Sequence, residues 1–212
     1  MSRFFNPENP VFRFLSGIFD MILLNVIFIL TSLPLFTIGA SLTALYSVLL
    51  WRENDNGYLH QIYFSSFRKN FRQATAVWIP CFAVTLFLSY ELYLVFRVLD
   101  PFWRFLQFPI WISLFLAVSI LLYAFPQIAR FEQKTLLILK NSILISISNI
   151  VLTIAVLAVS FFAVDLCLHN GDWLVLIVSI YLFIGFALTG KVFSFYLRSV
   201  FRKIEDGEQK RS

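Results

Sequence analysis

The sequence is poor in charged residues. Only 14% of its 212 residues are charged, whereas 59% are hydrophobic, and the mean hydropathy is +0.81. A soluble domain has about 25% charged and about 45–50% apolar residues, and one of this length cannot bury so much apolar surface. The shortage of charge therefore excludes a soluble enzyme, a disordered tail and a disulfide-rich secreted module. It predicts an all-α polytopic transmembrane helical bundle.

Cysteine, histidine and glycine are also scarce. The two cysteines, Cys81 and Cys167, both lie in apolar runs, as small hydrophobic residues do, so they do not indicate a disulfide or a metal pair. The sequence contains no CxxC, no HExxH and no glycine-rich phosphate loop. No two carboxylates stand at close helical spacing within one apolar run. We therefore expect a protein that is not an enzyme and that holds no cofactor and no metal.

Long hydrophobic runs dominate what is present. A helix needs about 20 apolar residues to cross about 30 Å of hydrocarbon. Four segments clearly satisfy this length, and they are Ala76 to Phe96, Phe108 to Phe125, Ile143 to Leu166 and Trp173 to Thr189. The composition of these runs predicts four transmembrane helices.

The N-terminal hydrophobic segment is harder to interpret. Residues 17–50 form one apolar stretch with a single charge, Asp20, which we interpret as a helix-end carboxylate at the membrane interface. Pro34 and Gly39 divide the stretch, because proline removes a backbone donor and glycine loosens a helix. We expect a span ending near Leu33 and a shorter helix over 41–51. Whether the shorter helix crosses the membrane stays open, so the chain has five or six membrane helices.

Lysine and arginine indicate the sidedness of the bundle. The stretches 52–72 and 126–142 and the C-terminal segment from Lys191 carry 13 basic residues, against 2 in the two intervening loops. Cytoplasmic loops are enriched in such residues. The excess of five positive charges therefore reflects membrane topology and does not indicate nucleic-acid binding. Arg3 and Arg13 favour a cytoplasmic N-terminus as well.

These observations define a single integral membrane domain over residues 1–212. Its segments alternate between membrane and cytoplasm. They are a cytoplasmic N-terminal segment (1–16), a broken hairpin (17–51), a cytoplasmic amphipathic loop (52–75), a hairpin (76–125), a cytoplasmic loop (126–142), a second hairpin (143–192) and a cytoplasmic tail (193–212).

Ionisable residues within apolar runs are candidate functional sites, because charge at membrane depth is costly. Glu91 lies about two turns from the outer end of its span, and Asp165 lies near the outer end of another, one turn before His169. These groups, together with Arg97 and Arg104, are candidates for a polar vestibule on the non-cytoplasmic side. The alternative interpretation is that they lie at the interface beside an aromatic belt.

The stretch YLHQIYFSSFRKNFRQ, residues 58–73, has aromatic residues on one face and basic residues at one end. Phe67 and Phe71 belong to the aromatic face, and Arg68, Lys69 and Arg72 form the basic end. Such a helix binds in the headgroup plane of a membrane that contains anionic lipid. Docking to a protein partner is the alternative.

Four segments resemble a known family. FFNPENPVFRFLSGIFD, TSLPLFTIGASLTALYSV, SSFRKNFRQAT and PQIARFEQKTLLILKNSI are similar to the YesL-like family of small bacterial membrane proteins. That family is of uncharacterised function, and its genes often accompany those for carbohydrate uptake and breakdown. The resemblance implies no catalytic residues. It implies a structural role for the Asn-Pro pairs near the N-terminus and for Gly39.

Two functions remain as hypotheses. The first is a non-enzymatic accessory or regulatory protein of the bacterial cytoplasmic membrane, linked to carbohydrate uptake. Its partners would be the lipid bilayer and the permease of an ABC importer or a membrane sensor kinase. The alternative is a small solute transporter or channel, with a polar path past Glu91, Asp165 and the break between Pro34 and Gly39.

Overall fold

Helices form all the regular structure of the computed structural model, which describes residues 10–51, 58–97, 101–169 and 171–209 and has no strand among them. The predicted N-terminal segment therefore lies outside the described residues up to position 9. Five helices are long and apolar enough to cross a membrane, which confirms the predicted all-α membrane bundle. They are Phe14–Ser32, Leu59–Arg97, Gln107–Arg130, Ile150–His169 and Gly171–Arg202.

The N-terminal hydrophobic segment consists of two helices separated by a turn. Helix α1 (Pro10–Ser32) is followed by a short 3-10 turn, η1 (Leu35–Thr37), and by α2 (Ile38–Trp51). Pro34 is extended, with φ −74° and ψ 118°, and so ends the helical path. The Thr37 hydroxyl donates hydrogen bonds to the carbonyls of residues 31 and 34, both at 2.6 Å, which closes the turn.

Helix α2 lies at the centre of the bundle. It contacts α1, α3, α4 and α8, and every side chain from 43 to 50 is buried. Gly39 lies in its first turn and not in the break. A Cβ at Gly39 would lie 2.6 Å from the Trp78 Cβ, so glycine here permits close approach of α3. With 14 residues, α2 is about 21 Å long, which is short for a membrane span.

Helix α3 (Leu59–Arg97) runs without interruption for 39 residues. The sequence predicts a separate amphipathic loop over 52–75 and a span from residue 76. Instead, the amphipathic stretch and the span form one helix of about 58 Å. The helix also continues through Pro80. The amphipathic stretch is thus continuous with the span, as one helix.

The C-terminal half differs in its boundaries from the sequence prediction. A turn, η2 (Pro101–Leu106), leads into α4 (Gln107–Arg130), and α5 (Thr135–Ser148) follows. The sequence predicts a span from Ile143, but α5 ends at Asn149, which has φ −122° and ψ 42°. Helix α6 (Ile150–His169) begins after it. The remaining elements are α7 (Gly171–Ile180), a π-helical turn η3 (Tyr181–Gly185) and α8 (Phe186–Gln209).

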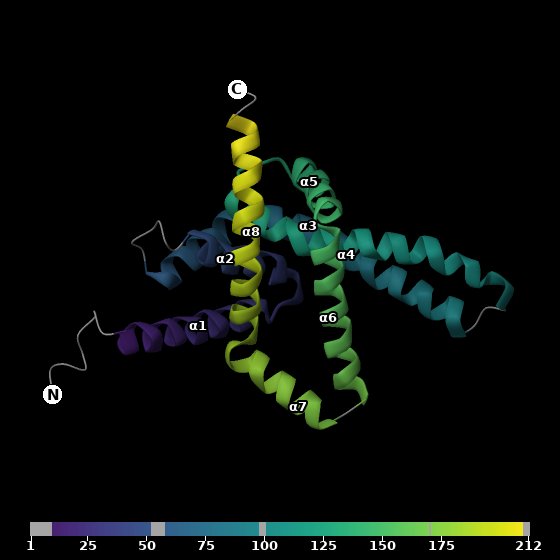
Figure 1. Ribbon diagram of the computed structural model, residues 1–212, viewed down its shortest axis with the longest axis horizontal. Helices are drawn as coiled ribbons and strands as arrows, with labels where there is room; N and C mark the ends of the chain where they lie inside the picture. Colours follow the sequence, from purple (N-terminus) through teal and green to yellow (C-terminus); the bar gives the residue numbers. More distant parts are fainter. Residues whose placement is uncertain (1–9, 52–57, 98–100, 170, 210–212) are drawn as a thin grey trace.

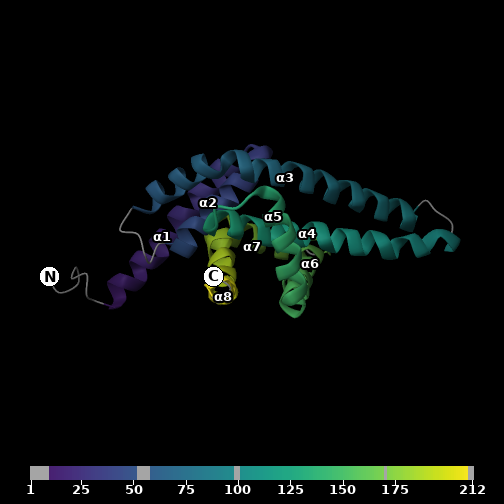
Figure 2. The same cartoon turned by 90° about the horizontal axis from the view of Figure 1, so that it is seen from above.

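Two hairpins project from the packed core, in different directions. Figure 1 shows the α3–α4 hairpin extending to one side, whereas α6 and α8 run across that direction, and Figure 2 shows the same separation from above. The α6–α7 hairpin is barely buried. Thr153 is the one buried residue of α6, and none of the ten residues of α7, all of them described, is buried.

Candidate functional site

A cavity of about 320 Å³ lies between α1, α2, the start of α3 and α8. Charged side chains from α1 and α8 meet there above an apolar wall. The pocket is lined by Asp20, Met21, Leu24, Val48, Leu49, Leu59, Lys191, Ser194, Phe195 and Arg198.

The contribution of α8 comes from a single helix face. Lys191, Ser194, Phe195 and Arg198 follow the i, i+3, i+4, i+7 spacing that aligns side chains along one side of a helix. Ser194 is buried, and its hydroxyl donates to the Lys191 carbonyl at 2.8 Å. The two cations therefore lie on either side of a small, internally satisfied hydroxyl.

Arg198 also holds the end of α2. Its Nη2 donates a hydrogen bond of 2.7 Å to the Leu49 carbonyl. Since α2 ends at Trp51, this carbonyl is among the last four of the helix and has no partner within it. A cation at a helix C-terminus also interacts favourably with the helix dipole. The guanidinium thus satisfies a buried helix end and forms part of the pocket at the same time.

Asn25, one residue after Leu24 of the pocket, joins α1 to the π-helical turn. Its Nδ2 donates to the carbonyls of Tyr181 and Leu182 at 3.0 and 2.9 Å, and its Oδ1 accepts from the Ala187 N–H at 3.1 Å. A π turn interrupts the regular i→i−4 pattern and leaves such groups to find other partners. Asn25 is completely buried, so these bonds fix α1 against α8 beside the pocket.

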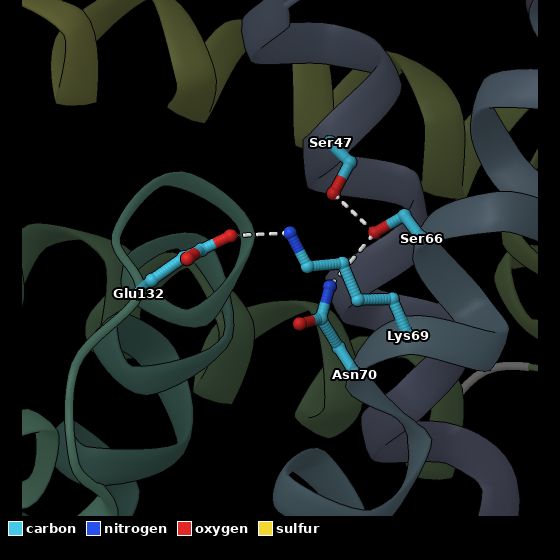
Figure 3. A network of polar contacts seen from close by, with 5 residues as sticks. All are labelled: Ser47, Ser66, Lys69, Asn70 and Glu132. Carbon is cyan, nitrogen blue, oxygen red and sulfur yellow. Dashed lines mark hydrogen bonds and ion pairs between the residues drawn. The ribbon is translucent and has the colours of Figure 1, made fainter.

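A second polar network joins α2, α3 and the loop between α4 and α5 (Figure 3). Ser47 and Ser66 share a hydrogen bond of 2.5 Å, and Asn70 Nδ2 donates to Ser66 Oγ at 3.1 Å. Lys69 Nζ donates to Glu132 Oε1 and forms an ion pair with it. The hydrogen bond and the charge of Lys69 lower the pKa of Glu132 below its ordinary value. This pair ties α3 to the α4–α5 loop.

The aromatic face of the predicted amphipathic stretch packs inside the protein. Phe67 and Phe71 are partly buried and contact the hydrophobic core. Arg68, Lys69 and Arg72 are exposed. Of the predicted lipid or partner patch, the basic end is therefore available at the surface, and its aromatic half is used in folding.

The predicted vestibule residues lie on two separate hairpins. Glu91 and Arg97 belong to the far half of α3, whereas Asp165 and His169 lie at the end of α6 (Figures 1 and 2). His169 Nδ1 is 3.3 Å from Asp165 Oδ1, so these two residues do pair. The side chain of Arg104 lies outside the described residues. Among the side chains described, no hydrogen bond or ion pair joins the two groups.

Aromatic side chains pack against the predicted helix break and the first turn of α2 that follows it. Trp78 Nε1 donates to the Leu35 carbonyl at 2.8 Å, and a Cβ on Gly39 would meet both Trp78 and Phe125 at 3.0 Å or less. The charged pocket is formed by other parts of α1 and α2. The break between Pro34 and Gly39 therefore serves helix packing in this structure.

Sequence reasoning missed most of this site. The sequence places Asp20 at the membrane interface, but it gives Lys191 and Arg198 no role beyond the excess of basic residues on the cytoplasmic side. Asn25 is a lone amide in the apolar run LLNVIF, and a polar side chain at membrane depth is itself a signal of interhelical hydrogen bonding. Its partners are more than 150 residues away, and no local pattern identifies them.

Comparison with known proteins gives one family match. Residues 21–92 match the model of a family described as "Protein of unknown function, DUF624". No curated protein and no solved structure matches the chain. Within the described residues, no group of three His, Cys, Asp or Glu side chains is placed to hold a metal ion.

Proposed function

We propose that this chain is a non-enzymatic accessory or regulatory membrane protein that binds a second integral membrane protein through its α6–α7 hairpin. The observation that carries the proposal is the near absence of burial along this hairpin, since Thr153 is the one buried residue among those described in α6 and α7. Val159 and Phe161 are 70% and 71% exposed. The exposed Ala155 and Ala158 leave room for a partner helix to approach closely.

The geometry favours this function over a transporter or channel. A transporter site needs polar groups gathered around a cavity at membrane depth. Glu91 and Asp165 belong to different hairpins, and Trp78 packs against the helix break, where it donates to the Leu35 carbonyl. This separation supports the accessory function over a polar path through the chain.

The sequence resemblance to the YesL-like family narrows the range of candidate partners. The family match over residues 21–92 is consistent with that resemblance and covers the tightly packed α2–α3 region. We therefore propose a role in carbohydrate uptake, with the permease of an ABC importer or a membrane sensor kinase as partner. The proposed location is the bacterial cytoplasmic membrane, with both termini on the cytoplasmic side.

Site-specific photo-crosslinking in membranes tests the proposal. A photoreactive residue at Phe161 of α6 should yield a cross-link to a permease or kinase, and that protein should co-purify at stoichiometric yield after gentle solubilisation. Phe87, which is 61% exposed on the α3–α4 hairpin, is the matched control. It should cross-link mainly to lipid.

Cross-links to lipid alone at both positions would contradict a protein partner on this hairpin. Solute flux into liposomes that contain only this chain, if lost in both Glu91→Gln and Asp165→Asn, would support the transporter instead. An Ala158→Trp variant adds a further check, because a lipid-facing surface tolerates a larger side chain and a helix–helix contact does not.

A further inference from the structure

We propose that the pocket between α1, α2 and α8 binds the phosphate group of a membrane glycerophospholipid. The ligand would place its phosphate between Lys191 and Arg198 and its glycerol and first acyl carbons against the apolar wall. This inference is independent of the proposed partner. The pocket residues of α8 lie toward the C-terminal end of the segment Gly171–Arg202, whereas the tip of the α6–α7 hairpin is at its N-terminal end.

The cationic side of the pocket suits a phosphate. Lys191 and Arg198 both line the cavity from one face of α8, two helical turns apart. Lysine binds phosphate as a point charge, whereas arginine also offers several directed N–H donors. Arg198 uses Nη2 for the Leu49 carbonyl. Lys191 makes no ion pair with any side chain that the structure describes, so its ammonium is the principal group available to the ligand.

The apolar wall indicates a lipid in place of a small water-soluble anion. Met21, Leu24 and Phe195 line the same cavity, and Phe195 is 81% exposed. Its ring extends the wall of the pocket outward to the surface. The pocket is charged on one side and continues into an exposed apolar surface on the other. This combination suits a lipid, in which a charged headgroup is joined to an acyl chain.

The position along the helices is that of the lipid headgroups. Asp20 lies in the second turn of the apolar segment that starts at Phe14, and Arg198 lies four residues before the end of the segment Gly171–Arg202. Each of these two groups therefore lies near one end of an apolar segment that is long enough to span a membrane. The ends of such segments are where a chain passes from the hydrocarbon into the headgroup layer.

Asp20 gives the pocket a preference among headgroups. Its carboxylate lines the same cavity as the two cations, and a carboxylate accepts hydrogen bonds at both of its oxygens. The hydroxyls of phosphatidylglycerol are donors for such a group, whereas the choline of phosphatidylcholine has no N–H or O–H. Two cations against one carboxylate still favour a net anionic headgroup.

Thermal unfolding of the full chain in a mild neutral detergent tests the proposal. Dioleoyl-phosphatidylglycerol should raise the midpoint saturably, and dioleoyl-phosphatidylcholine should do so weakly. Lys191→Gln should raise the phosphatidylglycerol concentration that gives half of the midpoint shift by about tenfold, as expected for one lost charge-assisted hydrogen bond. Lys140→Gln on α5 removes the same charge outside the pocket and should leave the effect unchanged.

A third titration, with glycerol 3-phosphate, distinguishes the two sources of phosphate. No response to it, with a full response to phosphatidylglycerol, supports the membrane lipid. A response to glycerol 3-phosphate as strong as that to the lipid overturns the lipid assignment in favour of a soluble phosphate ester. Equal responses to the two lipids, or equal responses of the Lys191→Gln and Lys140→Gln variants, overturn the site. Because Arg198 also holds α2, Lys191→Gln is the variant that leaves folding intact.

Discussion

Asn25 and Ala187 are joined by a hydrogen bond of 3.1 Å, although 162 residues separate them in the chain. The bond runs from the Ala187 backbone N–H to the amide oxygen of Asn25. It connects the first membrane helix to the start of the last helix, immediately after the π-helical turn. Since Asn25 is fully buried, this contact sets how α1 and α8 face each other and therefore shapes the pocket between them.

Replacing Asn25 with leucine should destabilise the protein by about 2 kcal/mol. The variant keeps the size of the side chain but removes its bonds to Tyr181, Leu182 and Ala187. Hydrogen bonds between membrane helices contribute about 0.6 kcal/mol each on average. Thermal unfolding in mild detergent measures the loss. Ser160→Ala, which removes a bond within one exposed helix, should change stability by less than about 0.5 kcal/mol. Equal midpoints for the two variants would show that the π turn does not depend on Asn25.

Gly39→Ala should destabilise the contact between α2 and α3 by about 1–3 kcal/mol, the usual cost of overpacking. The added Cβ would lie 2.6 Å from the Trp78 Cβ and 2.8 Å from the Ala74 carbonyl oxygen, so α3 has to shift. Gly17→Ala is the matched control, because nothing lies within 4 Å of its added Cβ. That substitution should be neutral or stabilising by up to about 1 kcal/mol through helix propensity. The idea fails if both alanine variants unfold at the wild-type midpoint.

Tyr196→Phe should loosen the junction between α5 and α6. Tyr196 Oη donates to Asn149 Oδ1 at 2.5 Å, and Asn149 is the residue at which the helix direction changes. Hydrogen–deuterium exchange should rise in the residues just after Asn149 and remain unchanged in α2. Tyr90→Phe, on an exposed part of α3, is the control and should leave the exchange pattern intact. Unchanged exchange at the junction in Tyr196→Phe would mean that the backbone alone holds it.

The Lys69–Glu132 ion pair should make the stability of the protein decrease as the pH falls into the acid range. Lys69 holds the pKa of Glu132 below its ordinary value of 4.5, so the unfolded chain takes up this proton first as the pH falls. The contribution of the pair is therefore complete above that value and is lost as the pH falls through the lowered pKa. Both side chains are largely exposed, so the effect is small.

Unfolding midpoints from pH 7 to pH 3 measure this effect. The difference between wild type and Glu132→Gln should be present near neutrality and vanish at the acid end. Lys69→Met should remove the same difference, because it eliminates the partner. A difference that persists at pH 3 would assign the effect to packing instead of charge.

Most membrane helices could be predicted from the sequence, but their boundaries could not. Hydrophobic length identified the regions of α1, α3, α4, α6 and α7, and Pro34 indicated the turn after α1. The sequence divided α3 at residue 76, where its composition changes from amphipathic to apolar. The backbone remains helical there, because a change of surrounding medium does not break i→i−4 hydrogen bonds.

At Asn149 the sequence prediction is wrong in the other direction, because it joins two helices into one span. Residues 143–166 are predominantly apolar, and this composition predicts one span from Ile143. The chain ends α5 at Asn149, whose side chain and backbone N–H bond to the Ile145 carbonyl and whose Oδ1 accepts from Tyr196. The Tyr196 partner is 47 residues away, so a local pattern gives no sign of this stop.

By itself the sequence determined that this chain is a membrane protein, which segments are apolar enough to span, and where proline interrupts them. These properties depend on the transfer of each segment from water to lipid, a free energy that is additive along the chain. Only the tertiary structure decided that Asp20, Lys191 and Arg198 share a pocket and that Glu91 and Asp165 lie on separate hairpins. Such pairings depend on close packing and on directed hydrogen bonds between distant segments. Local composition specifies neither the packing nor these hydrogen bonds.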